Sequence, residues 1–294
     1  MIRRTPVLTV EAEAFGSPCT LKLDQFQPTG SFKVRGASAL LTSLHMPDAG
    51  VVAASGGNFG QAIAWAAARL GHPAHIFVPA TSPAEKIAPI RRWGAEVHVV
   101  EGYYAEALAA AHDHVEVSGA AWAHAYDQRE VVAGQGTAAK ELLEDAPDLD
   151  TVVIACGGGG LLAGVAGWLQ DRVRVIAVET EGTAAFHGAR VAGHPVDVEV
   201  GGIAASALGA PRIGDLAWAA RGWIDDAIVV TDDEVVAAQR ALWGTTRLVA
   251  EPGGATALAA VTSGRYVPAA GERLAVLVCG ANTAPGSVSA VAAP

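Results

Sequence analysis

A single lysine in an unusual setting is the residue of this sequence best suited to chemistry. Lys33 lies in the segment DQFQPTGSFKVRGA (residues 24–37), and it is one of only four lysines among the 20 basic residues. Proline and glycine end a strand-like stretch at 19–23, and the apolar spacing turns helical from Phe32 onward. Burying a charged ammonium group costs free energy unless its pKa falls so that it loses its proton. The resulting neutral amine is a nucleophile that can form a Schiff base with an aldehyde cofactor. The alternative is a solvated lysine at a helix start.

A run of four glycines offers a place for a phosphate. The run follows an apolar stretch at 151–155 and opens a helical pattern, with members Gly157, Gly158, Gly159 and Gly160. Backbone N–H groups of such a turn can approach a phosphate closely, and the helix N-terminus adds partial positive charge. No Lys-Ser/Thr pair follows, which excludes a P-loop nucleotide site.

The same loop also fits a dinucleotide fingerprint. Gly158-x-Gly160-x-x-Ala163 has the right spacing, and Glu179 stands at the end of the next predicted strand, where a ribose-binding acid belongs. On these residues alone, a nicotinamide dinucleotide and a phosphorylated aldehyde cofactor are almost equally supported. Lys33 favours the aldehyde cofactor, because the chemistry of a dinucleotide-dependent enzyme does not explain the sequence around this lysine.

Strand-like and helix-like segments alternate along most of the chain, which predicts an α/β fold wound around parallel sheets. The predicted strands are 19–23, 51–54, 74–78, 96–100, 151–155, 173–178 and 274–278. The predicted helices are 59–70, 131–144, 161–169, 232–247, 253–262 and one that begins with a cap at Ser82 and ends at Gly94. Four features lie at carboxyl ends of these strands, where open α/β sheets bind ligands: residues 55–58, residues 156–160, Glu179 and Cys279. We therefore expect one site there.

Composition narrows the classes of function. Hydrophobic residues make up 51% of the 294 residues and charged residues 17%, and the net charge of −10 comes without a basic stripe. We therefore expect no nucleic-acid partner. No apolar run is long enough to span a bilayer, and the N-terminus lacks the apolar core of a signal peptide. The three cysteines have no metal-type spacing, which is typical of reduced thiols in a cytoplasm. The nine histidines show no metal-ligand spacing with the cysteines and are interpreted as surface or packing residues.

The Lys33 segment resembles the lysine signature of fold type II pyridoxal 5′-phosphate (PLP) enzymes in the serine/threonine dehydratase family, including liver-type serine dehydratases and serine racemases. Sulfhydrylases of that fold usually follow the lysine with Asp-Arg, whereas this chain has Val34-Arg35. The resemblance runs from Arg4-Thr5-Pro6 to the CGAN motif at 279–282. It implies a tryptophan synthase β-like fold of two open twisted α/β domains, with the cofactor in the cleft. Residues 1–45 and 131–294 would form the large domain and 46–130 a small inserted one.

The resemblance also implies roles for individual residues. Lys33 would carry PLP next to Phe32, and the loop Gly157–Gly160 would hold its 5′-phosphate. Ser55-Gly56-Gly57-Asn58 matches the loop over the pyridine ring. In that loop Asn58 would bond the ring's phenolic oxygen, while Ser55, as a catalytic candidate, and Gly57 would grip the substrate carboxylate. Phe59, beside the substrate, stands where many relatives carry histidine. An ordinary turn is the alternative interpretation of this string.

Cys279 ends the last predicted strand, where most family members place serine and liver-type serine dehydratases place cysteine. In the family this residue faces the pyridine nitrogen. A neutral thiol cannot keep that nitrogen protonated as a carboxylate would, so elimination is favoured over transamination. The alternative is an inert buried cysteine.

Glu179 has a second interpretation. In the family the matching glutamate binds a cation together with backbone carbonyls, here those of Thr183, Leu208 and Ala210. Racemase-type relatives carry a further carboxylate where this chain has Ala185. One carboxylate with carbonyls suits a monovalent ion such as potassium.

The resemblance thus implies PLP-dependent dehydration and deamination of L-serine, L-threonine or a related β-hydroxy amino acid to a 2-oxo acid and ammonia. An amino-acid racemase or a β-replacement synthase on the same fold is the alternative, and a dinucleotide-dependent oxidoreductase is a third. Serine racemases place a serine at the position of Gly56. We expect a homodimer, and because the chain stops soon after CGAN we expect a catabolic enzyme without a regulatory domain.

Overall fold

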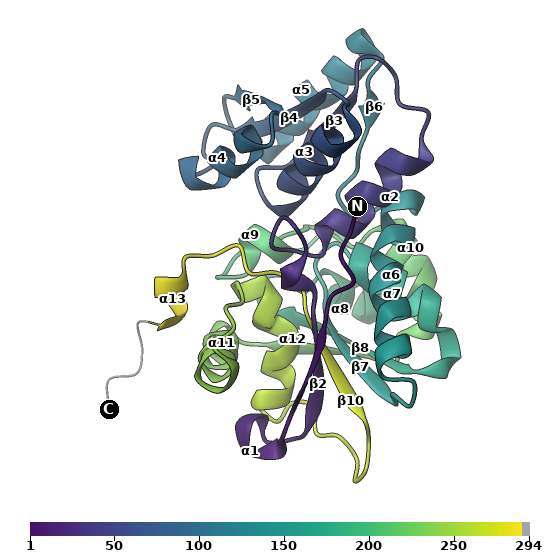
Figure 1. Cartoon of the computed structure of the whole chain (residues 1–294), viewed down its shortest axis with the longest axis vertical. Coiled ribbons are helices and arrows are strands. Elements are labelled where there is room, and N and C mark those ends of the chain that lie inside the picture. Colours follow the sequence, from purple (N-terminus) through teal and green to yellow (C-terminus); the bar gives the residue numbers. More distant parts are fainter. Residues whose placement is uncertain (290–294) are drawn as a thin grey trace.

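Two sheets organise the computed structural model, which describes residues 1–289 (Figure 1). The larger sheet has six strands in the order β1-β2-β10-β7-β8-β9, and only β1 runs antiparallel to its neighbour. The smaller sheet has the order β5-β4-β3-β6 and is parallel throughout. Parallel neighbours need long crossovers, and the helices supply them. The predicted α/β fold with parallel sheets is confirmed.

The strands of the two sheets have the following bounds. The larger sheet contains β1 (Val7–Val10), β2 (Cys19–Leu23), β7 (Thr151–Ala155), β8 (Arg174–Thr180), β9 (Asp226–Val230) and β10 (Leu274–Val278). The smaller sheet contains β3 (Val51–Ala54), β4 (Ala74–Pro79), β5 (Glu96–Val100) and β6 (Ala121–Trp122). All strands of the smaller sheet thus lie in one continuous part of the sequence, between two parts that build the larger sheet.

The helices surround both sheets. The α-helices are α1 (Ala12–Phe15), α2 (Lys33–Ser43), α3 (Asn58–Leu70), α4 (Ala84–Arg92), α5 (Tyr104–Ser118), α6 (Arg129–Asp145), α7 (Gly160–Leu169), α8 (Ala185–Ala192), α9 (Ala205–Leu208), α10 (Asp215–Ala219), α11 (Asp232–Thr246), α12 (Pro252–Thr262) and α13 (Pro285–Ser289). Short 3-10 turns are η1 (Asp24–Phe26), η2 (Gln170–Arg172) and η3 (Ala220–Trp223). No helix among residues 1–289 is both long and apolar enough to cross a bilayer.

Central strands were predicted well because their side chains are buried on both faces. All five residues of β7 and all five of β10 are buried, so these strands read as continuous apolar runs. The expected cap at Ser82 is wrong, since Pro83 flanks the first helical residue of α4 and no side chain caps it. The helix α5 was not predicted at all, because it buries only Ala107 and Ala111 and so lacks a clear apolar stripe.

The helix α2 connects the two halves of the molecule. It packs against both α3 and α6, and its residues Val34, Ala37 and Leu40 belong to the core of the smaller sheet. A separate core, formed around β2, β7, β8 and β10, holds the larger sheet together. Lys33 is the first residue of α2 and therefore stands where the two cores approach each other.

Candidate active site

Two adjoining cavities collect most of the residues singled out from the sequence. The larger, of about 220 Å³, is bordered by Lys33, Ser55, Gly56, Gly57, Asn58 and Phe59, and also by Leu208 and Ala210. The smaller, of about 30 Å³, is bordered by Phe32, Lys33, Cys279 and the glycine run. Lys33 and Gly158 border both cavities, so the amine and the glycine loop share one site. Of the four features expected to converge at carboxyl ends of strands, residues 55–58, the glycine run and Cys279 border these cavities, whereas Glu179 does not.

Lys33 is half-buried and borders both cavities. The Nζ atom donates a hydrogen bond to the carbonyl of Ala125 at 2.9 Å, and it lies 5.1 Å from the ring centroid of Phe32 and 5.7 Å from that of Phe59. Burial lowers the pKa of this amine to about 8, partly offset by the nearby Cys279. A substantial fraction is therefore neutral near neutral pH, which is the nucleophilic form.

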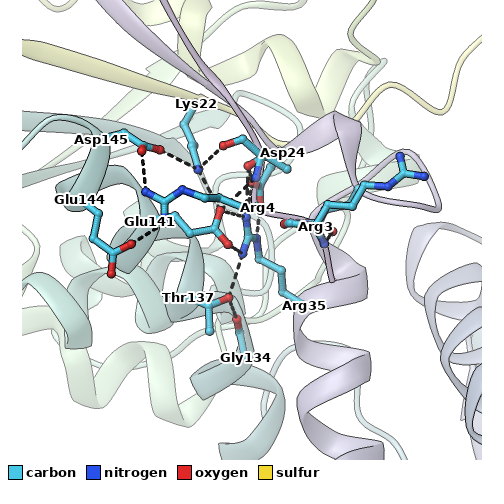
Figure 2. A network of polar contacts seen from close by, with 12 residues as sticks. Arg3, Arg4, Lys22, Asp24, Arg35, Gly134, Thr137, Glu141, Glu144 and Asp145 are labelled. Atoms are coloured by element: carbon cyan, nitrogen blue, oxygen red, sulfur yellow. Dashed lines mark hydrogen bonds and ion pairs between the residues drawn. The ribbon is translucent and has the colours of Figure 1, made fainter. Parts of the chain in front are cut away.

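A network of buried ion pairs, shown in Figure 2, surrounds Arg35 near the start of α2. Arg35, two residues along α2, is fully buried. Its guanidinium holds both carboxylate oxygens of Asp24 at 2.8 and 2.9 Å and both of Glu141 at 2.8 and 2.7 Å. Glu141 also accepts from the buried Lys22 at 2.9 Å. Such bidentate pairs are rigid, so β2, α2 and α6 are locked together behind Lys33.

Glu141 remains ionised within this network. Burial alone would raise the pKa of Glu141, but its hydrogen bonds from Arg35 and Lys22 hold that pKa at about 2. Thr5 adds its hydroxyl to Asp24 at 2.7 Å and its carbonyl to Lys22 at 2.7 Å. Each buried charge in the network thus has a partner of opposite charge, which offsets the free-energy cost of its burial.

The glycine loop forms the wall next to the amine. An added Cβ at Gly158 would lie 2.5 Å from the ring of Tyr126, and Gly159 has φ +88, a left-handed conformation that favours glycine. Within residues 1–289, no protein group accepts a hydrogen bond from the N–H of Gly157, Gly158 or Gly159. Three free donors at the start of α7 are what a phosphate requires, so the loop fits the phosphate group of PLP.

Ser55 to Asn58 joins β3 to α3 and faces the same cavity. Among residues 1–289, the hydroxyl of Ser55 accepts only a long bond from the N–H of Gly57, at 3.4 Å. Asn58 donates to Glu251 at 2.6 Å and accepts from Asn282 at 2.6 Å, so its amide is held in one orientation. Phe59 is buried, with its ring directed toward the Lys33 amine.

Cys279 borders the smaller cavity. It is buried, its thiol approaches the carbonyl of Gly253 at 3.5 Å, and its carbonyl accepts from the N–H of Phe32 at 2.9 Å. Burial raises the pKa of the thiol well above its usual range. The side chain is therefore a neutral thiol, as its predicted role next to a pyridine nitrogen requires.

Glu179 does not border either cavity. Its two carboxylate oxygens accept from the N–H groups of Phe186 at 2.8 Å and His187 at 2.7 Å, at the start of α8. Burial raises its pKa to about 7, although these bonds oppose the shift. Its carboxyl group therefore binds the first N–H groups of α8 and lies outside both cavities.

The sequence did not point to Glu251 or Tyr126. Glu251 precedes α12 and is buried, and burial raises its pKa to about 7. Tyr126 borders both cavities, and burial raises its pKa to about 12, so its hydroxyl keeps its proton. Nothing local distinguishes these residues from ordinary loop residues, because their partners are distant in the sequence.

Comparison with known proteins identifies the architecture. Residues 1–280 match the family model described as pyridoxal-phosphate dependent enzyme. The chain belongs to this family. It is 40% identical over 271 residues to the biosynthetic L-threonine dehydratase IlvA of Escherichia coli K12, covering 89% of this chain and 52% of that protein. It is 36% identical to the phenylserine dehydratase of Ralstonia pickettii, covering 96% and 89% of the two chains.

A solved structure shows the same PLP-enzyme fold. The structure of maize serine racemase superposes with a TM-score of 0.92 at 30% identity, covering 98% of this chain and 91% of that one. The predicted fold type II architecture is confirmed. The chain spans about half the length of the threonine dehydratases it matches. Because this is a PLP family, the dinucleotide interpretation of the glycine loop is wrong.

Proposed function

We propose that this PLP-family protein converts a β-hydroxy L-amino acid, such as L-serine or L-threonine, to a 2-oxo acid and ammonia. The observation that carries the proposal is the buried amine of Lys33, with its lowered pKa, next to three unpaired N–H donors of the glycine loop. Similarity to a threonine dehydratase and to a phenylserine dehydratase supports the substrate class. The net reaction removes the hydroxyl as water and releases the amino group as ammonia after hydrolysis.

The proposed roles of the side chains follow from their places. PLP, when bound, supplies an electron sink for the bond broken at the α-carbon. The amine of Lys33 takes the α-proton, which needs its neutral form. The donors of Gly157–Gly159 hold the phosphate, and Asn58 orients the ring oxygen. The neutral thiol of Cys279 faces the ring nitrogen. The loop that contains Ser55 and Gly57 binds the substrate carboxylate.

The purified protein provides the test. We expect a yellow chromophore that borohydride fixes covalently on Lys33, found by peptide mapping. With L-threonine or L-serine, oxo acid and ammonia should appear in equal amounts. A protein that binds PLP on Lys33 but forms no oxo acid from any β-hydroxy amino acid would overturn the activity while leaving the family assignment intact.

Racemisation is the second candidate, because the chain resembles the maize serine racemase. Racemisation needs an acid on the face opposite Lys33 that returns a proton to the α-carbon. Serine racemases place a serine at the position of Gly56. Gly56 has no side chain that could donate this proton. Chiral chromatography decides between the two reactions, since D-serine formed as fast as pyruvate would contradict elimination as the main activity.

We propose four further properties. A monovalent cation binds near Glu179 and the carbonyls of Thr183, Leu208 and Ala210, and two of these four residues border the larger cavity. Residues 46–130 form a small domain inserted between residues 1–45 and residues 131–294. The strands of the smaller sheet all come from one continuous stretch of sequence, which supports this division. Positions 290–294 of the large domain lie outside the described residues.

The protein is a homodimer, which light scattering would test. It acts in the cytoplasm, and its three free cysteines support this.

A further inference from the structure

Two histidines and a glutamate meet on one face of the smaller sheet. The parallel strands β4 and β5 pair His75 with Glu96 and Phe77 with His98. Side chains two residues apart in a strand point to the same face, so all four of these side chains share a face. The strand β5 is the outer strand of that sheet (Figure 1).

The three polar groups have the spacing of metal ligands. His75 Nδ1 lies 3.3 Å from His98 Nε2 and 3.4 Å from a carboxylate oxygen of Glu96, and His98 Nε2 lies 3.6 Å from the other oxygen. A tetrahedral zinc ion with bonds of about 2.0–2.1 Å separates neighbouring ligand atoms by roughly 3.4 Å. With one oxygen of Glu96 as the ligand, the three ligand atoms lie within 4.8 Å of one another, close enough to form one face of such a tetrahedron. Among residues 1–289, this is the only group of three such side chains with this spacing.

A third histidine, on α5, borders the cluster. The ring of His114 lies 4.6 Å from that of His75 and 5.5 Å from that of His98, measured between centroids. Its Nε2 atom is buried and has no hydrogen-bond partner in the described part of the chain. Buried polar atoms are rarely left unpaired, so this nitrogen indicates a missing group, such as water on an ion.

We propose that His75, Glu96 and His98 bind one divalent transition-metal ion, with zinc as the representative, and that a water next to His114 completes the coordination. Two imidazoles and one carboxylate suit zinc and its neighbours, whereas magnesium and calcium prefer oxygen ligands alone. The side chain of Glu96 is 65% exposed, which leaves an entry path for the ion.

This site is separate from the candidate active site. None of its three ligands borders either active-site cavity. The ion would instead connect β5 to β4, because one ligand comes from β4 and two come from β5. Its predicted effect is on the stability of the smaller sheet, since a ligand that binds only the folded state stabilises it by mass action.

Calorimetric titration of zinc chloride into the purified, PLP-containing, EDTA-treated enzyme tests the site. The variants are His98→Ala and Glu96→Gln, and His194→Ala, an exposed histidine elsewhere, is the matched control. We expect one zinc ion per chain, a loss of affinity of about tenfold or more in both variants, and wild-type affinity in the control. Zinc should also raise the melting temperature of wild type and control more than that of either variant.

Glu96→Gln keeps the test decisive if His98→Ala fails to fold. The glutamate side chain is mostly exposed, and its ion-pair partners in the described part of the chain are the two histidines, so this change leaves the core intact. The proposal is overturned if the wild-type enzyme binds no zinc, or if Glu96→Gln binds it as tightly as wild type. Either result would make the three imidazoles a packing cluster only.

Discussion

Asn58 and Glu251 are 193 residues apart in the sequence, yet the amide of Asn58 donates to the carboxylate of Glu251 at 2.6 Å. The contact joins the start of α3, which follows the smaller sheet, to the start of α12, which packs on the larger one. The loop proposed to bind substrate is thereby tied to the opposite wall of the site. A buried glutamate therefore sets the orientation of a proposed cofactor ligand.

Glu251 should make the stability of the cofactor-free protein depend on pH. Burial raises its pKa from 4.5 to about 7, so its contribution is fully present below about 4.5 and is lost as pH rises through 7. In Glu251→Gln, we expect the fall in unfolding free energy between pH 5 and pH 8 to shrink by about 3 kcal/mol. Urea titrations at both pH values measure this.

The control for that experiment is Glu116→Gln, on the exposed side of α5. It should show the wild-type pH dependence. An equal fall in Glu251→Gln and wild type would mean that Glu251 stays ionised in the folded protein. Glu179 has a similarly raised pKa, so part of the pH dependence should persist in every one of these proteins.

Attachment of PLP to the cofactor-free protein should report the pKa of Lys33. Because burial lowers this pKa to about 8, the neutral fraction of the amine rises about tenfold per pH unit below 8 and levels off above it. We expect the rate of covalent attachment, followed by absorbance, to have the same profile. A rate that keeps rising to pH 10 would show that the amine has its ordinary pKa.

Replacing Lys33 with alanine should leave the fold intact and remove turnover. Its side chain makes one hydrogen bond, to Ala125, and no ion pair with a described residue, so little stability depends on it. We expect oxo-acid formation to fall by at least about 10³-fold, and PLP to wash out in gel filtration. Lys140→Ala, on the exposed side of α6, is the control and should keep wild-type activity.

Arg35→Ala should destabilise the protein strongly. Asp24 and Glu141 would each lose a bidentate partner, and removing one partner from a buried ion pair costs about 3–5 kcal/mol. Arg4 also pairs with acidic residues, Glu144 and Asp145, but at the surface. Arg4→Ala should therefore leave the denaturation midpoint nearly unchanged. Equal midpoints for the two variants would argue against the network as the anchor of Lys33.

Activity should rise with potassium or ammonium ions and should survive EDTA. The proposed site near Glu179 has one carboxylate and no acid at Ala185, which suits a monovalent ion. Removal of zinc from the cluster around His75 should not affect turnover, because that cluster lies outside the cavities. Inactivation by EDTA that calcium or magnesium reverses would contradict the monovalent site.

Much of the molecule could be predicted because the signals are local. The apolar runs of β7 and β10, the helical spacing after Phe32 and the glycine run each depend on residues close together in the chain. Since carboxyl ends of parallel strands share an edge, the meeting of the glycine run and Cys279, which follow the neighbouring strands β7 and β10, could also be expected. By itself the sequence thus determined the α/β class and the resemblance to PLP enzymes.

Tertiary structure decided what depends on distant atoms. Glu251 meets Asn58, Arg35 meets Glu141 across 106 residues, and His75 meets His98 across 23, and no local pattern encodes these pairs. The lowered pKa of Lys33 also belongs here, because it depends on how completely the folded chain excludes water from the amine. Contacts and burial arise only when the two sheets and their helices pack, so they follow from the whole fold rather than from any segment of the sequence.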